Sequence, residues 1–326
     1  MINELLLGLF TNLLYDIIKS GTKISAEELL KNTNYSYNEC QYIADSIGYC
    51  NTNDKDELRK IINNTDIIEK INRDYYKTNF SIRLDYIVNL LRKHIPSVNI
   101  EWLCDKLGYD SSNKLLNYYR IPKEPSFNFI EEFSKEIGIK SNWLKYGVDE
   151  NPFDTIHLGI NRELLSYIKD NNIDSIIFAF SKNSLSQYNN SELIIIFKFN
   201  DLKYIINTKY IPFGSFVGGG GTNQICELFV FILWLKKEEL LDICKSYSIS
   251  EEMHNNLLMG KEYGKAVEKC NNSLGNLIED FINLNTFPPT EEQKLDFYGK
   301  SFIDCQQIIR ENIDSVYKIK NDLLTK

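Results

Sequence analysis

The chain has 326 residues, of which 43% are hydrophobic, 25% charged and 13% aromatic. This balance is ordinary for globular proteins and excludes wholesale disorder and collagen-like repeats, and the length suggests two or three domains. The formal net charge is −8, so any nucleic acid would have to meet a locally basic or neutral face.

The first part of the chain, 1–80, is predicted to be a helical region. Apolar residues from Leu5 to Ile18 recur at helical spacing, but the run is too short to span a bilayer and Asp16 interrupts it. No basic start or small-residue cleavage site accompanies it, so we expect neither a signal peptide nor a transmembrane segment. The run is interpreted as a buried helix, with a membrane-interface or partner-binding helix as the alternative.

Seven cysteines are scattered along the chain, and no two of them form a CxxC pair. An odd number without metal-ligand spacing predicts reduced thiols in a cytoplasmic protein and no structural zinc. No other metal or cofactor pattern stands out, so we expect no cofactor.

The middle part, 81–154, is predicted to be five short helices joined by tight turns. Pro96 ends the first helix, Asn99 caps the second, and Ser126 caps a later one that Gly138 ends. The end of this part, from residue 149 onward, is interpreted as a linker.

Five motifs carry a family resemblance that covers about 65 residues of this part: Asn99–Gly108, Leu115–Arg120, Glu124–Ser126, Phe133–Gly138 and Trp143–Gly147. Together they resemble the Cro/CI-type helix-turn-helix family of phage repressors and xenobiotic-response-element-like regulators. The resemblance implies a DNA-binding module that docks as a homodimer on inverted half-sites of double-stranded DNA, with its third helix in the major groove. By position, the DNA-binding residues would be Ser111, Ser112, Asn113, Lys114 and Asn117.

The chain departs from the family pattern at the helices that would meet DNA. Ile100 stands where a glutamine is usual, Ser111 where an arginine is usual, and Ile121 where a glycine is usual. Residues 82–148 hold ten Lys and Arg against eight Asp and Glu, a net charge of +2 (10 − 8), which is small for displacing counterions from phosphates. A degenerate helical scaffold that binds protein therefore stays open beside DNA binding.

The third part, 155–326, changes to an α/β pattern. Runs at 174–180, 192–199 and 202–211 predict an antiparallel β-meander, followed by an apolar helix. Apolar or small residues then step by three or four over 253–281 and again over 295–319, which predicts a long helical hairpin that packs on the sheet or joins two subunits.

The glycines Gly218–Gly221 precede the apolar helix and fit no complete phosphate-loop pattern, because Gly220 stands where the lysine should be. Two interpretations stay open: a flexible connection that Thr222 ends as a helix cap, or an anion or nucleotide pocket. The ligand-binding residues of that pocket would be Gly219, Gly220, Gly221 and Thr222.

Glu192, Asp201 and Lys203 loosely resemble the acidic pair and lysine of Mg²⁺-dependent nucleases. Because Asp201 also suits a turn, we interpret them as turn and surface residues, and no catalytic residue is predicted.

These patterns together predict an α+β fold that is mostly α, with three parts at 1–80, 81–154 and 155–326. The function predicted from them is a DNA-binding transcriptional regulator, such as a repressor, whose C-terminal domain senses a ligand or a partner. The alternative is an interaction or effector component of a phage-defence or toxin–antitoxin system that uses a degenerate helix-turn-helix scaffold.

Overall fold

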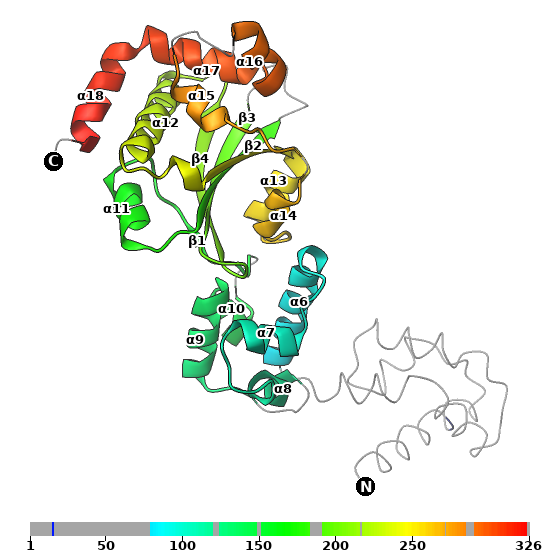
Figure 1. Cartoon of the computed structure of the whole chain (residues 1–326). Coiled ribbons are helices and arrows are strands. Elements are labelled where there is room, and N and C mark those ends of the chain that lie inside the picture. Colours follow the sequence, from blue (N-terminus) through cyan, green and yellow to red (C-terminus); the bar gives the residue numbers. More distant parts are fainter. Residues whose placement is uncertain are drawn as a thin grey trace. The chain divides into compact units, whose positions relative to one another are not determined.

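The structure is a computed structural model (Figure 1). It describes Tyr15 and residues 79–119, 124–148, 151–182, 191–215, 217–270, 272–284 and 290–324. The predicted N-terminal helices, including the run from Leu5 to Ile18, lie outside these residues, Tyr15 apart. The chain divides into two compact units, Met1–Ile82 with Leu115–Glu124, and Arg83–Lys114 with Pro125–Lys326.

The described residues form an α+β fold that is mostly α-helical, as predicted. Residues 79–148 hold the five short helices expected from the sequence, here called the helical module. These helices are α6 (Asn79–His94), α7 (Ile100–Lys106), α8 (Asn113–Tyr119), α9 (Phe127–Ile137) and α10 (Ser141–Tyr146).

Local signals set the ends of these helices. The side chain of Asn99 accepts a hydrogen bond from the backbone N of Trp102 at 2.7 Å, and that of Ser126 accepts one from Phe129 at 3.2 Å. Gly138 ends α9 in the left-handed conformation, with φ of 69°. The predicted caps are therefore confirmed, because each satisfies backbone groups that a helix end leaves open.

The α/β part is built on a sheet of five strands in the order β1-β4-β3-β2-β5. The strands are β1 (Thr155–Ile156), β2 (Ser175–Lys182), β3 (Ser191–Lys198), β4 (Tyr204–Phe213) and β5 (Cys244–Ser250). The antiparallel meander β2-β3-β4 is confirmed. The two outer strands pair in parallel, β1 with β4 and β5 with β2, so the sheet is mixed and the prediction of an antiparallel sheet alone was incomplete.

The buried Asn207 extends the short pairing of β1 with β4. Its amide group donates to the carbonyl of Leu158 at 2.8 Å, and its side-chain oxygen accepts from the backbone N of Leu158 at 3.1 Å. The side chain thus takes the place of a backbone partner beyond the end of β1 and satisfies groups that would otherwise be buried without one.

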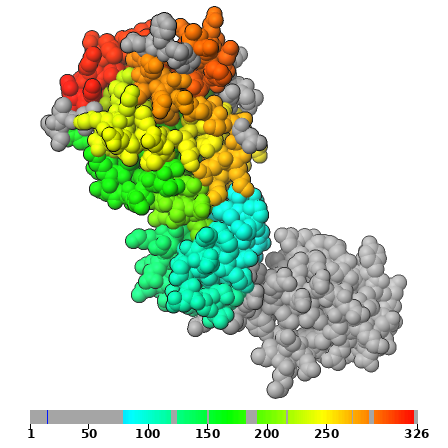
Figure 2. Space-filling model, in the orientation of Figure 1, coloured from blue at the N-terminus to red at the C-terminus, as the bar shows by residue number. Residues whose placement is uncertain are grey.

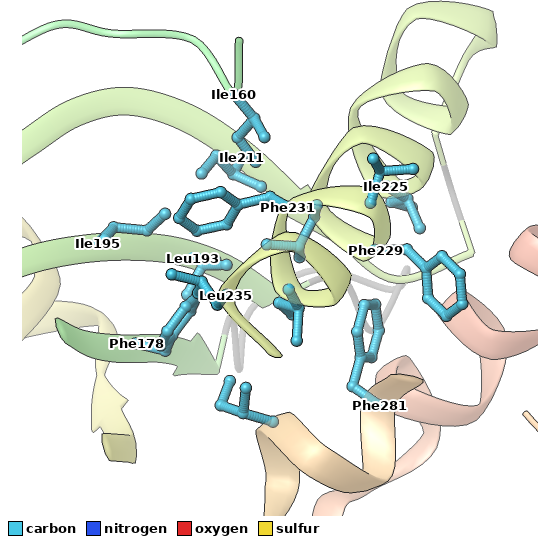
Figure 3. Close-up of a cluster of buried hydrophobic side chains, with 14 of the residues drawn as sticks. Ile160, Phe178, Leu193, Ile195, Ile211, Ile225, Phe229, Phe231, Leu235 and Phe281 are labelled. Carbon is cyan, nitrogen blue, oxygen red and sulfur yellow. The ribbon is translucent and has the colours of Figure 1, made fainter. Parts of the chain in front are cut away.

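Helices cover both faces of the sheet (Figure 1). On one side lie α11 (Arg162–Asp170) and α12 (Gly219–Lys237), and on the other α13 (Glu251–Leu258) and α14 (Lys265–Glu268). The first side holds the main core, in which Phe178 and Ile195 of the sheet face Phe231 of α12 (Figure 3). Because both faces are covered, the central strands are apolar on both sides, which explains their unbroken hydrophobic runs.

The predicted long helical hairpin is wrong. The first expected helix, 253–281, is divided into α13, α14 and α15 (Leu277–Ile282), and Gly260 and Gly275 between them have φ of 69° and 53°. The second, 295–319, is divided into α16 (Glu291–Tyr298), α17 (Lys300–Glu311) and α18 (Ile313–Leu324), with Gly299 at φ 82°. Left-handed glycines end a helix whatever the apolar spacing around them.

The segment expected to be a linker packs against the helical module. The backbone N of Lys140 donates to the carbonyl of Pro152, and that of Asp154 donates to the carbonyl of Gly138, both at 2.9 Å. Phe153 is buried and its ring lies 5.3 Å from that of Tyr263. Residues 151–154 therefore attach helices α9 and α10 to the α/β part.

A second contact joins the end of α6 to the segment between α13 and α14. His94 Nε2 lies 2.6 Å from Oε1 of Glu262, and both side chains are largely buried. Figure 2 shows the adjoining surfaces of these two segments. Residues 83–114 and 125–148 of the module thus share one compact unit with the α/β part.

Candidate functional site

The turn between α7 and α8 exposes most of the residues predicted to contact DNA. Ser111, Asn113, Lys114 and Asn117 are exposed, and Ser112 is half-buried. Leu115, between them in sequence, is fully buried. The helix therefore buries an apolar side chain and leaves a hydrophilic surface in water, the arrangement that a recognition helix requires.

The first turn of α8 is held by the serines before it. The hydroxyl of Ser111 accepts from the backbone N of Asn113 at 3.2 Å, and its carbonyl accepts from the N of Lys114 at 3.2 Å. The carbonyl of Ser112 accepts from Sγ of Cys104 at 3.5 Å. Ser111 and Ser112 thus precede the helix and hold its first turn, and Asn113, Lys114 and Asn117 lie on it.

Aromatic rings lie beside the cations of this turn. Lys114 Nζ lies 4.1 Å from the ring centroid of Tyr109, and Lys106 Nζ lies 5.8 Å from that of Trp102. Burial, together with the nearby Cys104 and Glu136, raises the pKa of Tyr109 to about 12. The tyrosine is therefore neutral at physiological pH and can serve as a platform for the lysine.

The segment that holds α7 and α8 is slightly acidic. Between residues 99 and 119 there are two lysines and three carboxylates, which gives a net charge of −1 (2 − 3). Two arginines of the module bind backbone carbonyls: Arg83 donates to Leu144 at 2.7 Å, and Arg92 donates to Val98 at 2.9 Å. Base contacts rather than phosphate contacts would therefore have to carry DNA affinity here.

The four glycines form the start of a helix and not a loop. Gly218 is the N-cap of α12, the helix begins at Gly219, and the backbone N of Thr222 donates to the carbonyl of Gly218 at 3.0 Å. The prediction that Thr222 caps the helix was wrong, because the glycines themselves adopt helical geometry. A Cβ on Gly219 or Gly220 would meet nothing within 4 Å, whereas one on Gly221 would come within 2.6 Å of Val217 Cβ.

Of the three residues that resemble a nuclease site, Glu192 lies far from Asp201 and Lys203, which share the turn between β3 and β4. Glu192 is near the start of β3 and lies 3.4 Å from Nε2 of His254. Asp201 follows the other end of that strand, and the six residue steps from Glu192 to Lys198 alone span roughly 20 Å at about 3.3 Å per residue. They cannot share a metal ion, and in the described part of the chain no group of three His, Cys, Asp or Glu side chains is placed to hold one.

A charged network that sequence patterns did not reveal surrounds Glu268 of α14. Its Oε2 accepts from the hydroxyl of Tyr204 at 2.6 Å, and its Oε1 lies 3.5 Å from Nζ of both Lys198 and Lys245. Burial opposes ionisation of Glu268, but the hydrogen bond from Tyr204 and the lysines outweigh it, so the pKa of Glu268 is lowered. Because these groups satisfy one another, the network holds α14 on the sheet.

No family model, no curated protein and no solved structure matches the chain. Among the described residues, no helix is long and apolar enough to cross a membrane.

Proposed function

We propose that the chain is a DNA-binding transcriptional regulator in which α8 enters the major groove and the α/β part senses a ligand or a partner. One observation carries this proposal: the exposed polar side chains of α8 above its buried Leu115. The resemblance of the α6–α10 sequence to Cro/CI-type modules, and the five helices found there, support it.

The residues of α8 suit direct contact with bases. Asn113 and Asn117 are four positions apart, so both side chains leave the same face of the helix. An asparagine amide can pair with N6 and N7 of adenine, and a lysine such as Lys114 can donate to O6 and N7 of guanine. Two chains related by a two-fold axis would place these residues on half-sites about 34–36 Å apart.

The contacts between the helical module and the α/β part would let a movement of the α/β part change the position of helices in the module. The Lys140–Pro152 and Asp154–Gly138 hydrogen bonds fix the backbone after α9, and His94–Glu262 fixes the end of α6. A ligand that shifted the α/β part would therefore change the positions of α9, α10 and the end of α6, provided that it binds the two arrangements with different affinity.

The test is selection of bound sequences from a random DNA library, followed by gel-shift titration of the best sequence at 50 and 200 mM salt. We expect a palindromic site, and the Asn113→Ala and Asn117→Ala variants should each weaken binding roughly tenfold, since a good base contact contributes about 1–3 kcal/mol. Asn283→Ala, an exposed asparagine of the α/β part, is the matched control. No selected sequence at low salt would refute DNA binding.

A second candidate, binding of a protein partner by the same module, is favoured by exposed rings on α9 and α10. Phe127 and Tyr146 are 60% and 59% exposed, and their ring centroids lie 6.3 Å apart. Exposed aromatic groups of this kind mark protein interfaces. Co-purification from cells of an effector or toxin partner that Phe127→Ala abolishes, without any selected DNA, would favour this candidate.

A further inference from the structure

A pocket of about 350 Å³ lies between the beginning of α11, the first half of α12 and α18. Its volume is at the lower end of the range for small-molecule sites, roughly 300–1,000 Å³, so it suits a metabolite. Six polar residues line it together with Ile160 and Ile319: Asn161, Asn223, Glu227, Ser315, Lys318 and Asp322. On α12 the pocket begins at Asn223, directly after the residues Gly219–Thr222 that were predicted to bind a ligand, and it uses none of those four.

Neighbouring contacts fix the walls of this pocket. Asn161 caps α11 by accepting from the backbone N of Glu163 at 3.0 Å. Arg162, the next residue, donates from Nε to the backbone carbonyl of Asp322 at 3.1 Å, which ties the end of α18 to the start of α11. The three helices therefore meet at a defined opening.

The wall formed by α12 carries a half-buried carboxylate. Asn223 donates to Oε1 of Glu227 at 2.6 Å, one helical turn away. Burial raises the pKa of Glu227, while Lys209 and Asn223 oppose that rise. The Glu227 carboxylate is thus held in a fixed direction and retains acceptor capacity for a cationic group.

The opposite wall, on α18, carries both signs of charge. Lys318 and Asp322 are exposed, and within the described ranges neither side chain forms an ion pair with any other residue. Lys318 and Glu227 also line the same pocket without coming within 4.0 Å of each other. Two opposite charges that line one pocket without pairing with each other are complementary to a ligand that itself carries both charges.

We propose that this pocket binds a free α-amino acid, whose ammonium group lies at Glu227 and whose carboxylate lies at Lys318. Asn223 and Ser315 add neutral hydrogen-bonding groups, and Ile160 and Ile319 give the ligand's side chain an apolar surface. The inference rests on the ligand-sensing half of the proposed function and not on its DNA-binding half.

Isothermal titration calorimetry of the full chain, without DNA, tests the proposal with each standard L-amino acid in turn. We expect one amino acid, or a chemically related few, to bind. The same compound without its amino group, and the same compound without its carboxylate, should each bind roughly tenfold more weakly or worse, since a hydrogen bond to a charged group contributes about 1.5–3 kcal/mol.

The variants Glu227→Gln and Lys318→Gln keep side-chain size and should each lower affinity about tenfold or more. Glu252→Gln and Lys320→Gln are exposed controls outside the pocket and should bind as the parent chain does. Thermal melting of all four variants verifies folding.

Absence of binding by every amino acid at millimolar concentration would overturn the inference, as would binding that both pocket variants leave unchanged. A chain that binds an amino acid but selects no DNA would refute DNA binding alone. A chain that selects DNA but binds no amino acid would refute the inference alone.

Discussion

The helical module and the α/β part place their charged side chains differently. In the α/β part, Glu268 and Asp201 accept lysines from other elements, and the pKa of each carboxyl is lowered. In the module, Arg83 and Arg92 bind carbonyls of its own backbone, while Lys114 and the asparagines of α8 face water. The Glu268 and Asp201 ion pairs therefore stabilise the α/β fold, whereas the polar side chains of α8 are left in water.

This difference predicts that the two parts respond very differently to substitution. Changes in the core and in the Glu268 network of the α/β part should lower folding stability, and changes on the exposed face of α8 should leave it nearly unchanged. The four predictions below run from the largest expected effect on stability to the smallest.

The largest effect should come from the core beneath α12. Phe231→Ala removes a fully buried ring that lies 6.3 Å from the ring of Trp234, and we expect it to lower the free energy of unfolding by about 3–5 kcal/mol. The matched change Phe127→Ala, on the exposed surface of α9, should change it by less than about 0.5 kcal/mol. Urea unfolding followed by circular dichroism measures both, and equal losses would contradict the division between the two parts.

The Glu268 network should give the next largest effect. Tyr204→Phe leaves a partly buried carboxylate without its hydroxyl donor and should cost about 1–3 kcal/mol. Folding lowers the pKa of Glu268, so the ionised carboxylate contributes to folding stability at pH values above the ordinary carboxyl pKa. This contribution to stability is lost as the pH falls below that ordinary pKa and the carboxylate is protonated. Glu268→Gln should therefore flatten the fall in melting temperature below about pH 4.5, and an unchanged acid profile would exclude this role.

The glycines at the start of α12 should give opposite results at neighbouring positions. Gly221→Ala places a Cβ within 2.6 Å of Val217 Cβ and should destabilise the fold by roughly 1–3 kcal/mol. Gly220→Ala meets open space in a helical conformation and should be neutral or stabilise by up to about 1 kcal/mol. Thermal melts of the two variants decide this, and a destabilised Gly220→Ala would indicate a constraint beyond helix packing.

The smallest effect on stability should come from α8. The exposed Lys114→Ala should change the free energy of unfolding by less than about 0.5 kcal/mol, although it removes a cation above Tyr109. On the proposed function, the same variant weakens DNA binding. Parallel melting and gel-shift measurements separate the two effects, and a large loss of stability would show that α8 supports the fold.

Much of the module could be predicted because its signals are local. Asn99, Ser126 and Gly138 act within three or four residues of the helix end that they set. The tail of the chain could not be predicted in the same way, since its apolar spacing is helical but Gly260 and Gly299 interrupt it. The apolar spacing indicated which residues are buried against α12 and the sheet, but it did not indicate how long each helix is.

The candidate sites show the same limit. The exposed residues of α8 are neighbours in sequence, so a family resemblance was enough to select them for testing. The pocket draws on residues 160–161, 223–227 and 315–322, which only the tertiary fold brings together. The one local signal of this pocket was a polar residue, Asn223, within an apolar helix. The same pattern is equally compatible with a residue that simply lies on the surface.

The mixed pairing of the sheet has a consequence for how the chain reaches its native state. The strands β2, β3 and β4 pair with sequence neighbours, so this centre can form early. The parallel outer strands need partners that are distant along the chain, and β5 is made only after α12. Closing those long loops is entropically costly, so the outer strands should pair with the sheet after its three central strands have formed. Hydrogen exchange during refolding should therefore protect the backbone amide of Ile195 before that of Tyr247.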